Sequence, residues 1–194
     1  MLHQLDSSQF RALTVAGDVT SLLPTLAPQQ SDDPNTLLAK IIAAIGAAGF
    51  VDVTLTTDTS AYASGDVVAD TQVIANACRA VNQPAILQSV MLVDKADQGA
   101  ALDLHFFSAN VSMGTENSAP SISDANALNY LGKIAIATDD YTDLTGCKVA
   151  HKVALGHLVK PATDTRDIYV AVVNGSGTPT FAADSLVLRL GFLW

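Results

Sequence analysis

Four histidines are the first side chains that could do chemistry in this chain: His3, His105, His151 and His157. No HxH, HExxH or CxxC pattern, which would bring several ligands to one metal ion, accompanies them. His151 and His157 are expected on one face of a single strand, about 20 Å apart at roughly 3.3 Å per residue. The sequence favours structural or surface roles for all four and predicts no metal and no cofactor.

The sequence around the serines does not predict a hydrolase. The G-x-S-x-G turn that presents a nucleophilic serine is absent, and the chain has so many Ser and Asp residues that chance explains their presence. Glu116 is the only glutamate. Paired-carboxylate chemistry, such as that of a cell-wall hydrolase, would therefore depend on aspartates alone. We expect that the protein is not an enzyme.

Two clusters of aspartates raise the question of a calcium site. Calcium takes six to eight oxygen ligands, and the EF-hand spacing of these ligands is absent. Aspartate also shapes turns through hydrogen bonds from its own side chain. We favour this turn-forming role and keep a bound cation as the alternative. The clusters are Asp94, Asp97 and Asp103, and Asp139, Asp140 and Asp143.

The charge balance excludes several classes of partner. The formal net charge is −9, with only ten Lys and Arg residues. Such a chain does not neutralise a nucleic-acid backbone, and it has no GxGxxG or Walker loop for phosphate. No apolar run approaches the length of a membrane span, and no basic n-region begins a signal peptide. We therefore predict no nucleic-acid and no membrane partner.

Composition indicates which elements must position these side chains. Charged residues make up 15% of the 194 residues, and a single glutamate stands against eighteen aspartates. Glutamate tolerates helix interiors, whereas aspartate prefers caps and turns, so this balance favours a mostly β protein. Cys78 and Cys147 are the only cysteines. Two cysteines make no disulfide framework, and we expect two buried free thiols.

From residue 51 onward apolar and polar residues alternate, which is typical of half-buried strands. About eight strands separated by Asp- and Gly-rich turns predict an antiparallel β-sandwich or jelly-roll-like domain over residues 51–194, with a barrel as the alternative. The expected strands are 51–57, 67–74, 85–93, 101–107, 133–138, 149–159, 167–173 and 185–192.

A long insertion at 108–131 interrupts the strands. Its second half is expected to form a short helix, capped by Ser121 or Ser123, with a weak apolar face that includes Leu128 and Leu131. Loops of this length in a compact domain are often functional or interaction surfaces.

Residues 1–50 differ from the rest and are expected to form an N-terminal arm. Apolar residues at helical spacing predict a helix at 36–48 with a single charge, Lys40. Such an apolar stripe packs either under the β domain or against another subunit. Trp194, the only tryptophan, is expected to pack at a strand end or against a neighbouring subunit. The candidate partner contacts are Leu37, Leu38, Ile41, Ile42, Ile45 and Trp194.

Several stretches resemble small structural proteins of tailed bacteriophages, a group of head decoration (cement) or minor capsid proteins. The resemblance covers about residues 50–193 and carries over no catalytic or ligand residues. It is found in VDVTLTTDTSAYASGDVVADTQVI (51–74), ILQSVMLVDKADQGAALDLHFF (86–107), APSISDANALNYLGKIAIATDDYTDL (119–144) and LVLRLGFL (186–193).

The resemblance implies a protein of the phage head surface, made in the host cytoplasm, which stabilises the shell by binding across subunits of the major capsid protein. Shell symmetry favours closed homo-oligomers, and we expect a trimer in preference to a dimer. The alternative is a receptor- or carbohydrate-binding module of a head or tail fibre. In that case the 108–131 insertion and the 174–180 loop would form its recognition surface.

Overall fold

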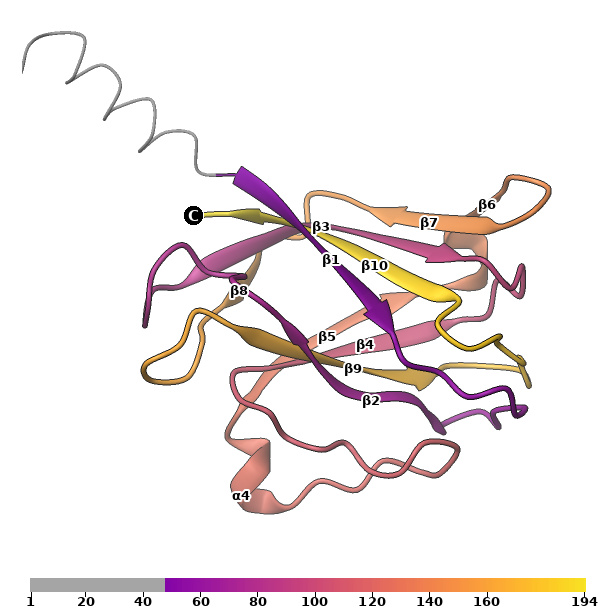
Figure 1. Cartoon of the computed structure of the whole chain (residues 1–194), viewed down its shortest axis with the longest axis horizontal. Helices are drawn as coiled ribbons and strands as arrows, with labels where there is room; N and C mark the ends of the chain where they lie inside the picture. The colour runs from indigo at the N-terminus through magenta and orange to yellow at the C-terminus, as the bar shows by residue number, and fades with distance from the viewer. Residues whose placement is uncertain (1–47) are drawn as a thin grey trace, which may run out of the picture. The chain divides into compact units, whose positions relative to one another are not determined.

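The alternating pattern forms ten strands in the computed structural model, which describes residues 48–194 (Figure 1). Strands from distant parts of the chain lie side by side, and every pairing is antiparallel. One sheet contains β1 (Ala48–Leu55), β10 (Leu186–Leu193), β3 (Ala85–Asp94), β7 (Lys148–Lys152), β6 (Tyr141–Asp143) and β8 (His157–Val159). The other contains β2 (Val67–Ile74), β9 (Ile168–Asn174), β4 (Leu102–Phe107) and β5 (Tyr130–Ile136).

The strand order is that of a jelly roll. β7 pairs with the second half of β3 and β8 pairs with its first residues, so the two act as one interrupted strand. The sheets then read β1-β10-β3-β7/β8 and β2-β9-β4-β5, and the chain passes repeatedly from one sheet to the other. Eight strands in two facing antiparallel sheets define this architecture. The predicted fold class is confirmed, with β6 as an added short edge strand.

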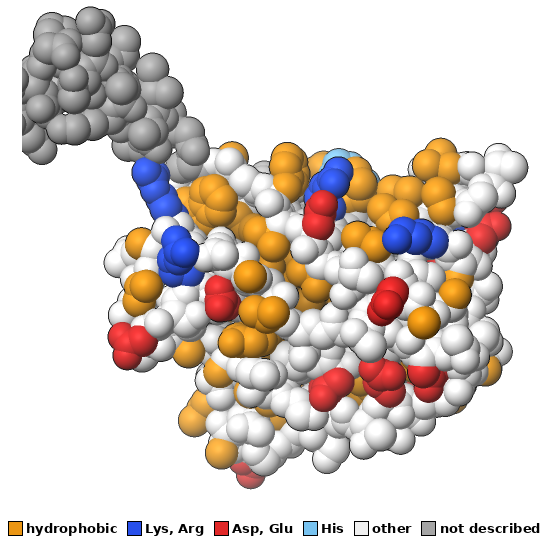
Figure 2. Space-filling model, in the orientation of Figure 1, with side chains coloured by type: hydrophobic (Ala, Val, Ile, Leu, Met, Phe, Trp, Pro, Cys, Tyr) orange, Lys and Arg blue, Asp and Glu red, His pale blue; other side chains and the backbone are white. Residues whose placement is uncertain are grey.

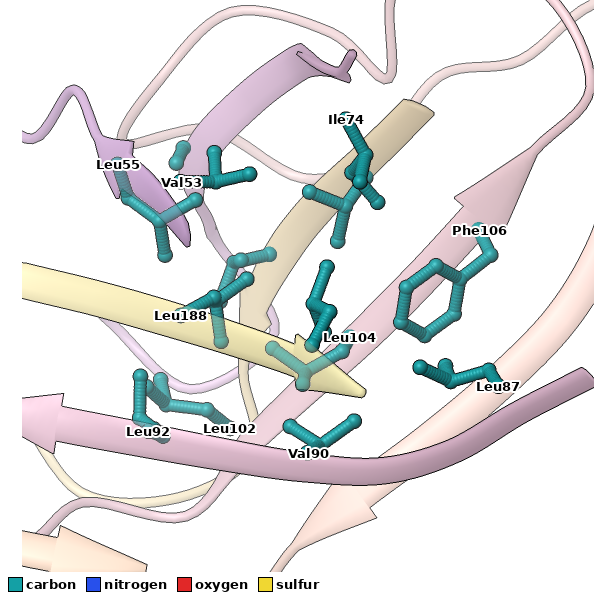
Figure 3. Close-up of a cluster of buried hydrophobic side chains, with 14 of the residues drawn as sticks. Val53, Leu55, Ile74, Leu87, Val90, Leu92, Leu102, Leu104, Phe106 and Leu188 are labelled. Atoms are coloured by element: carbon teal, nitrogen blue, oxygen red, sulfur yellow. The ribbon is translucent and has the colours of Figure 1, made fainter. Parts of the chain in front are cut away.

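The core lies between the two sheets (Figure 3). Inward side chains from both sheets point toward one another in this layer, as the alternation of each strand requires. Leu188, at the centre of β10, faces Leu104 of the opposite sheet across the layer, and both are fully buried. The remaining labelled members are Val53, Leu55, Ile74, Leu87, Val90, Leu92, Leu102 and Phe106.

The predicted single strand at 149–159 is wrong, because the chain breaks between β7 and β8. Ala154 and Gly156 both adopt positive φ, which ends regular pairing there. As a result His151 and His157 do not share a face. His151 pairs with Met91 on the solvent side of its sheet, whereas His157 pairs with the buried Leu87.

The insertion after β4 covers the outer side of the β2-β9-β4-β5 sheet. Val111 and Met113 are buried there against Phe107 and Ala171. Its short helix α4 (Asp124–Ala127) is capped by the Ser123 hydroxyl, one of the two predicted caps. Of the predicted apolar helix face, Leu128 is 89% exposed, whereas Leu131 lies in β5 and packs against the core. No helix within residues 48–194 is long and apolar enough to cross a membrane.

Candidate functional site

Three of the six aspartates that suggested a cation site organise turns. The Asp94 side chain is fully buried and accepts hydrogen bonds of 2.8–2.9 Å from the backbone N–H groups of Ala96, Gln98 and Gly99. Asp143 accepts from the Thr145 N–H at 2.7 Å. Asp140 accepts from the Ala137 N–H at 2.7 Å and pairs with Lys152.

The remaining members of these two clusters are also accounted for. Asp97 and Asp103 form ion pairs with Lys148 and Lys133, and Asp139 is exposed. Within residues 48–194 no group of three or more His, Cys, Asp or Glu side chains is placed to hold a metal ion. The hydrogen bonds of Asp94, Asp140 and Asp143 match the turn-forming role that we favoured, whereas Asp97 and Asp103 lie in ion pairs.

The three described histidines lie on different strands. The Nδ1 atom of His105 on β4 lies 3.1 Å from the Tyr130 hydroxyl, and burial lowers the pKa of this histidine. The His157 ring packs beneath Gly132 and beside Phe106, and its Nε2 atom has no hydrogen-bond partner. His151 on β7 belongs to the same sheet as His157 but is exposed on its solvent side. The three described histidines thus occupy separate structural positions, and the expected shared face of His151 and His157 does not form.

Neither described cysteine is in a disulfide. Cys78 is buried, as predicted, and burial raises the pKa of its thiol to about 11. Cys147 is only partly buried, which differs from the prediction. A thiol whose pKa lies above its usual range is a poor nucleophile near neutral pH. Cys78 is therefore a core residue.

Trp194 packs within the chain. Its indole Nε1 donates a 2.6 Å hydrogen bond to the Ala77 carbonyl, and its ring lies against Gly49, where a Cβ atom would clash with it. This contact matches the strand-end alternative for Trp194, while its role as a partner contact stays a prediction.

The other candidate contacts lie outside the described residues. They are Leu37, Leu38, Ile41, Ile42 and Ile45. The expected 36–48 helix also lies outside them, except for Ala48, which begins β1.

The main candidate for a functional surface is the solvent side of the β1-β10-β3-β7 sheet, which we call the outer face. Figure 2 shows hydrophobic side chains gathered along the upper side of the sandwich, over this sheet. Three cross-strand rows of residues lie on the outer face. They are Val187–Val93–Val149, Arg189–Met91–His151 and Leu193–Ile86–Leu158.

Large apolar side chains of the outer face are open to solvent. Phe50 is 73% exposed, Leu158 is 66% exposed and Val153 is 62% exposed. An antiparallel sheet with a packed core on one side usually has polar residues on the other. Exposed apolar side chains gathered on one face are typical of interaction sites, so the outer face is the candidate surface.

One ion pair lies within this apolar surface. The Arg189 guanidinium donates two hydrogen bonds of 2.8 Å to the Asp52 carboxylate across β1 and β10. This contact holds the pKa of Asp52 below its ordinary value. Beside the pair, a shallow groove of about 450 Å³ is lined by Phe50, Ser89, Met91 and Val153, among others.

Sequence reasoning missed the outer face. The only charged residue of β10, in LVLRLGFL, is Arg189, and such near-continuous apolar runs are typical of strands covered on both sides. The two sheets differ in how their solvent sides are covered. The 108–131 insertion covers the β2-β9-β4-β5 sheet. No described segment covers the outer face in the same way.

No protein-family model and no curated protein matches the chain. Three solved virus structures are similar to it, each over 75% of its length. They are the capsid of Ralstonia phage GP4 (20% identity, 82% of that chain, TM-score 0.38), Desmodium yellow mottle tymovirus (11%, 80%, 0.26) and infectious bursal disease virus Gx strain (11%, 36%, 0.17). Because all three TM-scores lie below 0.5, the fold assignment rests on the strand order alone.

Proposed function

We propose that this chain is a structural protein of a virus particle, and more specifically a decoration protein that binds across coat subunits on the head of a tailed phage. The outer face carries this proposal, because a sandwich that leaves one apolar sheet face open is suited to a place in a multi-subunit assembly, where another subunit, a coat protein or a further copy of this chain, covers that face. The resemblance over residues 50–193 and the jelly-roll strand order, which capsid and lectin domains share, support it.

The proposed mechanism is stabilisation by mass action. A protein that binds assembled coat subunits and not free ones shifts the equilibrium toward the shell. Each contact needs only modest affinity, because many copies act on one particle. The net charge of −9 suits a protein that faces solvent and lies away from packaged DNA.

Particles that carry or lack the protein provide the test. We expect the protein in purified particles at high copy number, gold-labelled antibody on the head, and DNA release at a lower temperature from particles without it. Absence of the protein from particles would overturn the virion role. Presence without any effect on the temperature of DNA release would overturn the stabilising role alone.

We also propose that residues 1–50 supply part of the contact with the coat or with neighbouring copies. The composition changes near Phe50, and an arm can become ordered on a neighbouring subunit during assembly. Deletion of residues 1–34 should lower occupancy on particles. Unchanged occupancy would remove this part of the proposal.

A receptor- or carbohydrate-binding module is the second candidate. An open polar depression of about 800 Å³ beside the insertion is lined by Asp70, Ser112, Thr115 and Glu116, among others, which are groups that can bond sugar hydroxyls. Low aromatic content, at 6%, counts against stacking on sugar rings. Antibody labelling at the tail, together with binding to host-cell glycans, would favour this candidate over the decoration protein.

A further inference from the structure

The outer face is self-complementary in charge. Asp52 and Arg189 lie side by side in the same cross-strand row, so the face presents one negative and one positive group next to each other. A two-fold axis in the plane of the face, perpendicular to the line between these groups, places each carboxylate opposite a guanidinium of the other copy. In an isologous interface of this kind the same patch serves both partners.

The outer face also carries an exposed aromatic side chain at a shallow groove. Phe50 is the most exposed large apolar side chain of β1, its ring lies over Gly191, and it lines the groove together with Ser89. Exposed aromatic side chains of this kind are enriched among the central residues of protein interfaces.

We propose that the outer face pairs with the same face of a second copy of this chain, through a two-fold axis near the Asp52–Arg189 pair. The rows around the ion pair supply the apolar area, and the four charged groups fix the register. Charge patterns of this kind contribute more to specificity and orientation than to affinity. This pairing differs from the trimer that shell symmetry favours.

The mass of the purified full chain in solution, measured by light scattering over a range of concentrations, is the first test. We expect a dimer that Phe50→Ser with Val153→Ser weakens at least about tenfold in dissociation constant. The matched control is Leu128→Ser, which changes an exposed apolar residue near α4 on the opposite side of the sandwich. Circular dichroism verifies that all variants are folded.

A charge exchange tests the two-fold geometry. Asp52→Arg alone and Arg189→Asp alone should each weaken the pair, because like charges then face each other across the axis. An equimolar mixture of the two variants should form a heterodimer, since opposite charges face each other again. Native mass spectrometry distinguishes the heterodimer from either homodimer.

Three results would overturn the proposal: a monomer at all concentrations up to about 1 mM, a trimer, or a dimer that neither set of outer-face variants weakens. Failure of the mixture to form heterodimers would reject the two-fold register. The measurements use no virus particles. Their failure would therefore leave the virion role standing, and failure of the virion role would leave a solution dimer standing.

Discussion

At the scale of single residues, the preference for aspartate over glutamate has a structural reason. The short Asp side chain reaches backbone N–H groups two to five residues further along the chain, as Asp58, Asp94 and Asp143 do. A glutamate in the same turn would place its carboxylate one methylene too far out. The acidity of this chain is therefore largely part of its architecture, and sequence reasoning could predict this from composition alone.

Asp94 is the position where loss of such a carboxylate should cost most. Asp94→Ala removes the acceptor for three backbone N–H groups from a fully buried site. We expect a loss of about 3 kcal/mol in the free energy of unfolding, measured by urea denaturation. Asp139→Ala is the control at an exposed site and should change it by less than about 0.5 kcal/mol. Equal effects of the two variants would contradict the turn-forming role.

His105 should make the fold sensitive to mild acid. Burial lowers the pKa of His105 in the folded state from its ordinary value of 6.5. The Asp103 charge raises this pKa, and the Lys133 charge lowers it. The unfolded chain then binds a proton before the folded chain does. Stability is therefore full above about pH 6.5 and declines as the pH falls from there through the lower folded-state pKa.

Thermal unfolding between pH 7.5 and 5 measures this effect. The His105→Gln variant should lose less stability than the wild type over this interval. His151→Gln, which removes an exposed histidine on the other sheet, is the matched control. A His105→Gln slope equal to that of the wild type would show that another group is responsible.

At the scale of elements, the strands were predictable where a run of β-branched and other apolar residues, continuous or alternating with polar ones, lies between turn-forming residues. The expected strand at 67–74 matches β2, and those at 85–93 and 185–192 match β3 and β10 within one residue at each end. β6 forms in a segment that reads as a turn, and the break between β7 and β8 depends on a positive φ at Ala154. Hydrophobic periodicity predicts neither β6 nor this break, because the pairing partner determines the first and the backbone conformation determines the second.

The packing of the insertion on its sheet could also not be predicted from the sequence. Its length suggested an exposed surface, but β2 holds it in place: the Asp70 carboxylate accepts hydrogen bonds from Ser112 Oγ at 2.9 Å and from the Met113 N–H at 2.7 Å. Val67 exchanges backbone hydrogen bonds of 2.9 Å with Asn117 and Ser118. Only the pairing of residues distant in the sequence reveals that this segment covers a sheet.

Met113 should therefore behave as a core residue. Met113→Ala removes a side chain that is 4% exposed in the second apolar cluster, and we expect a loss of about 2–3 kcal/mol in the free energy of unfolding. Leu128→Ala, in the same insertion but 89% exposed, is the control and should be nearly neutral. Similar small effects for both variants would mean that the insertion does not pack on its sheet in solution.

At the scale of the whole molecule, the sandwich combines one shared core with two unlike outer sides. The core cluster runs from Val53 to Phe192 and takes side chains from both sheets, so neither sheet can bury its inner face alone. One outer side is closed by the chain's own insertion, and the outer face is left apolar. Folding and the proposed association would thus use different surfaces, so we expect variants such as Phe50→Ser to affect association while they leave the core intact.

The shared core also predicts how residues 48–194 unfold. Expressed alone, this fragment contains both sheets and their common cluster, so we expect it to fold and to unfold in one cooperative transition. Trp194 fluorescence reports on the end of β10, and far-UV circular dichroism reports on all strands. Their urea midpoints should coincide, and Leu104→Ala, on the opposite sheet, should lower both midpoints equally, by the equivalent of about 3 kcal/mol. If the fluorescence midpoint stayed in place while the dichroism midpoint fell, the two sheets would be separate folding units.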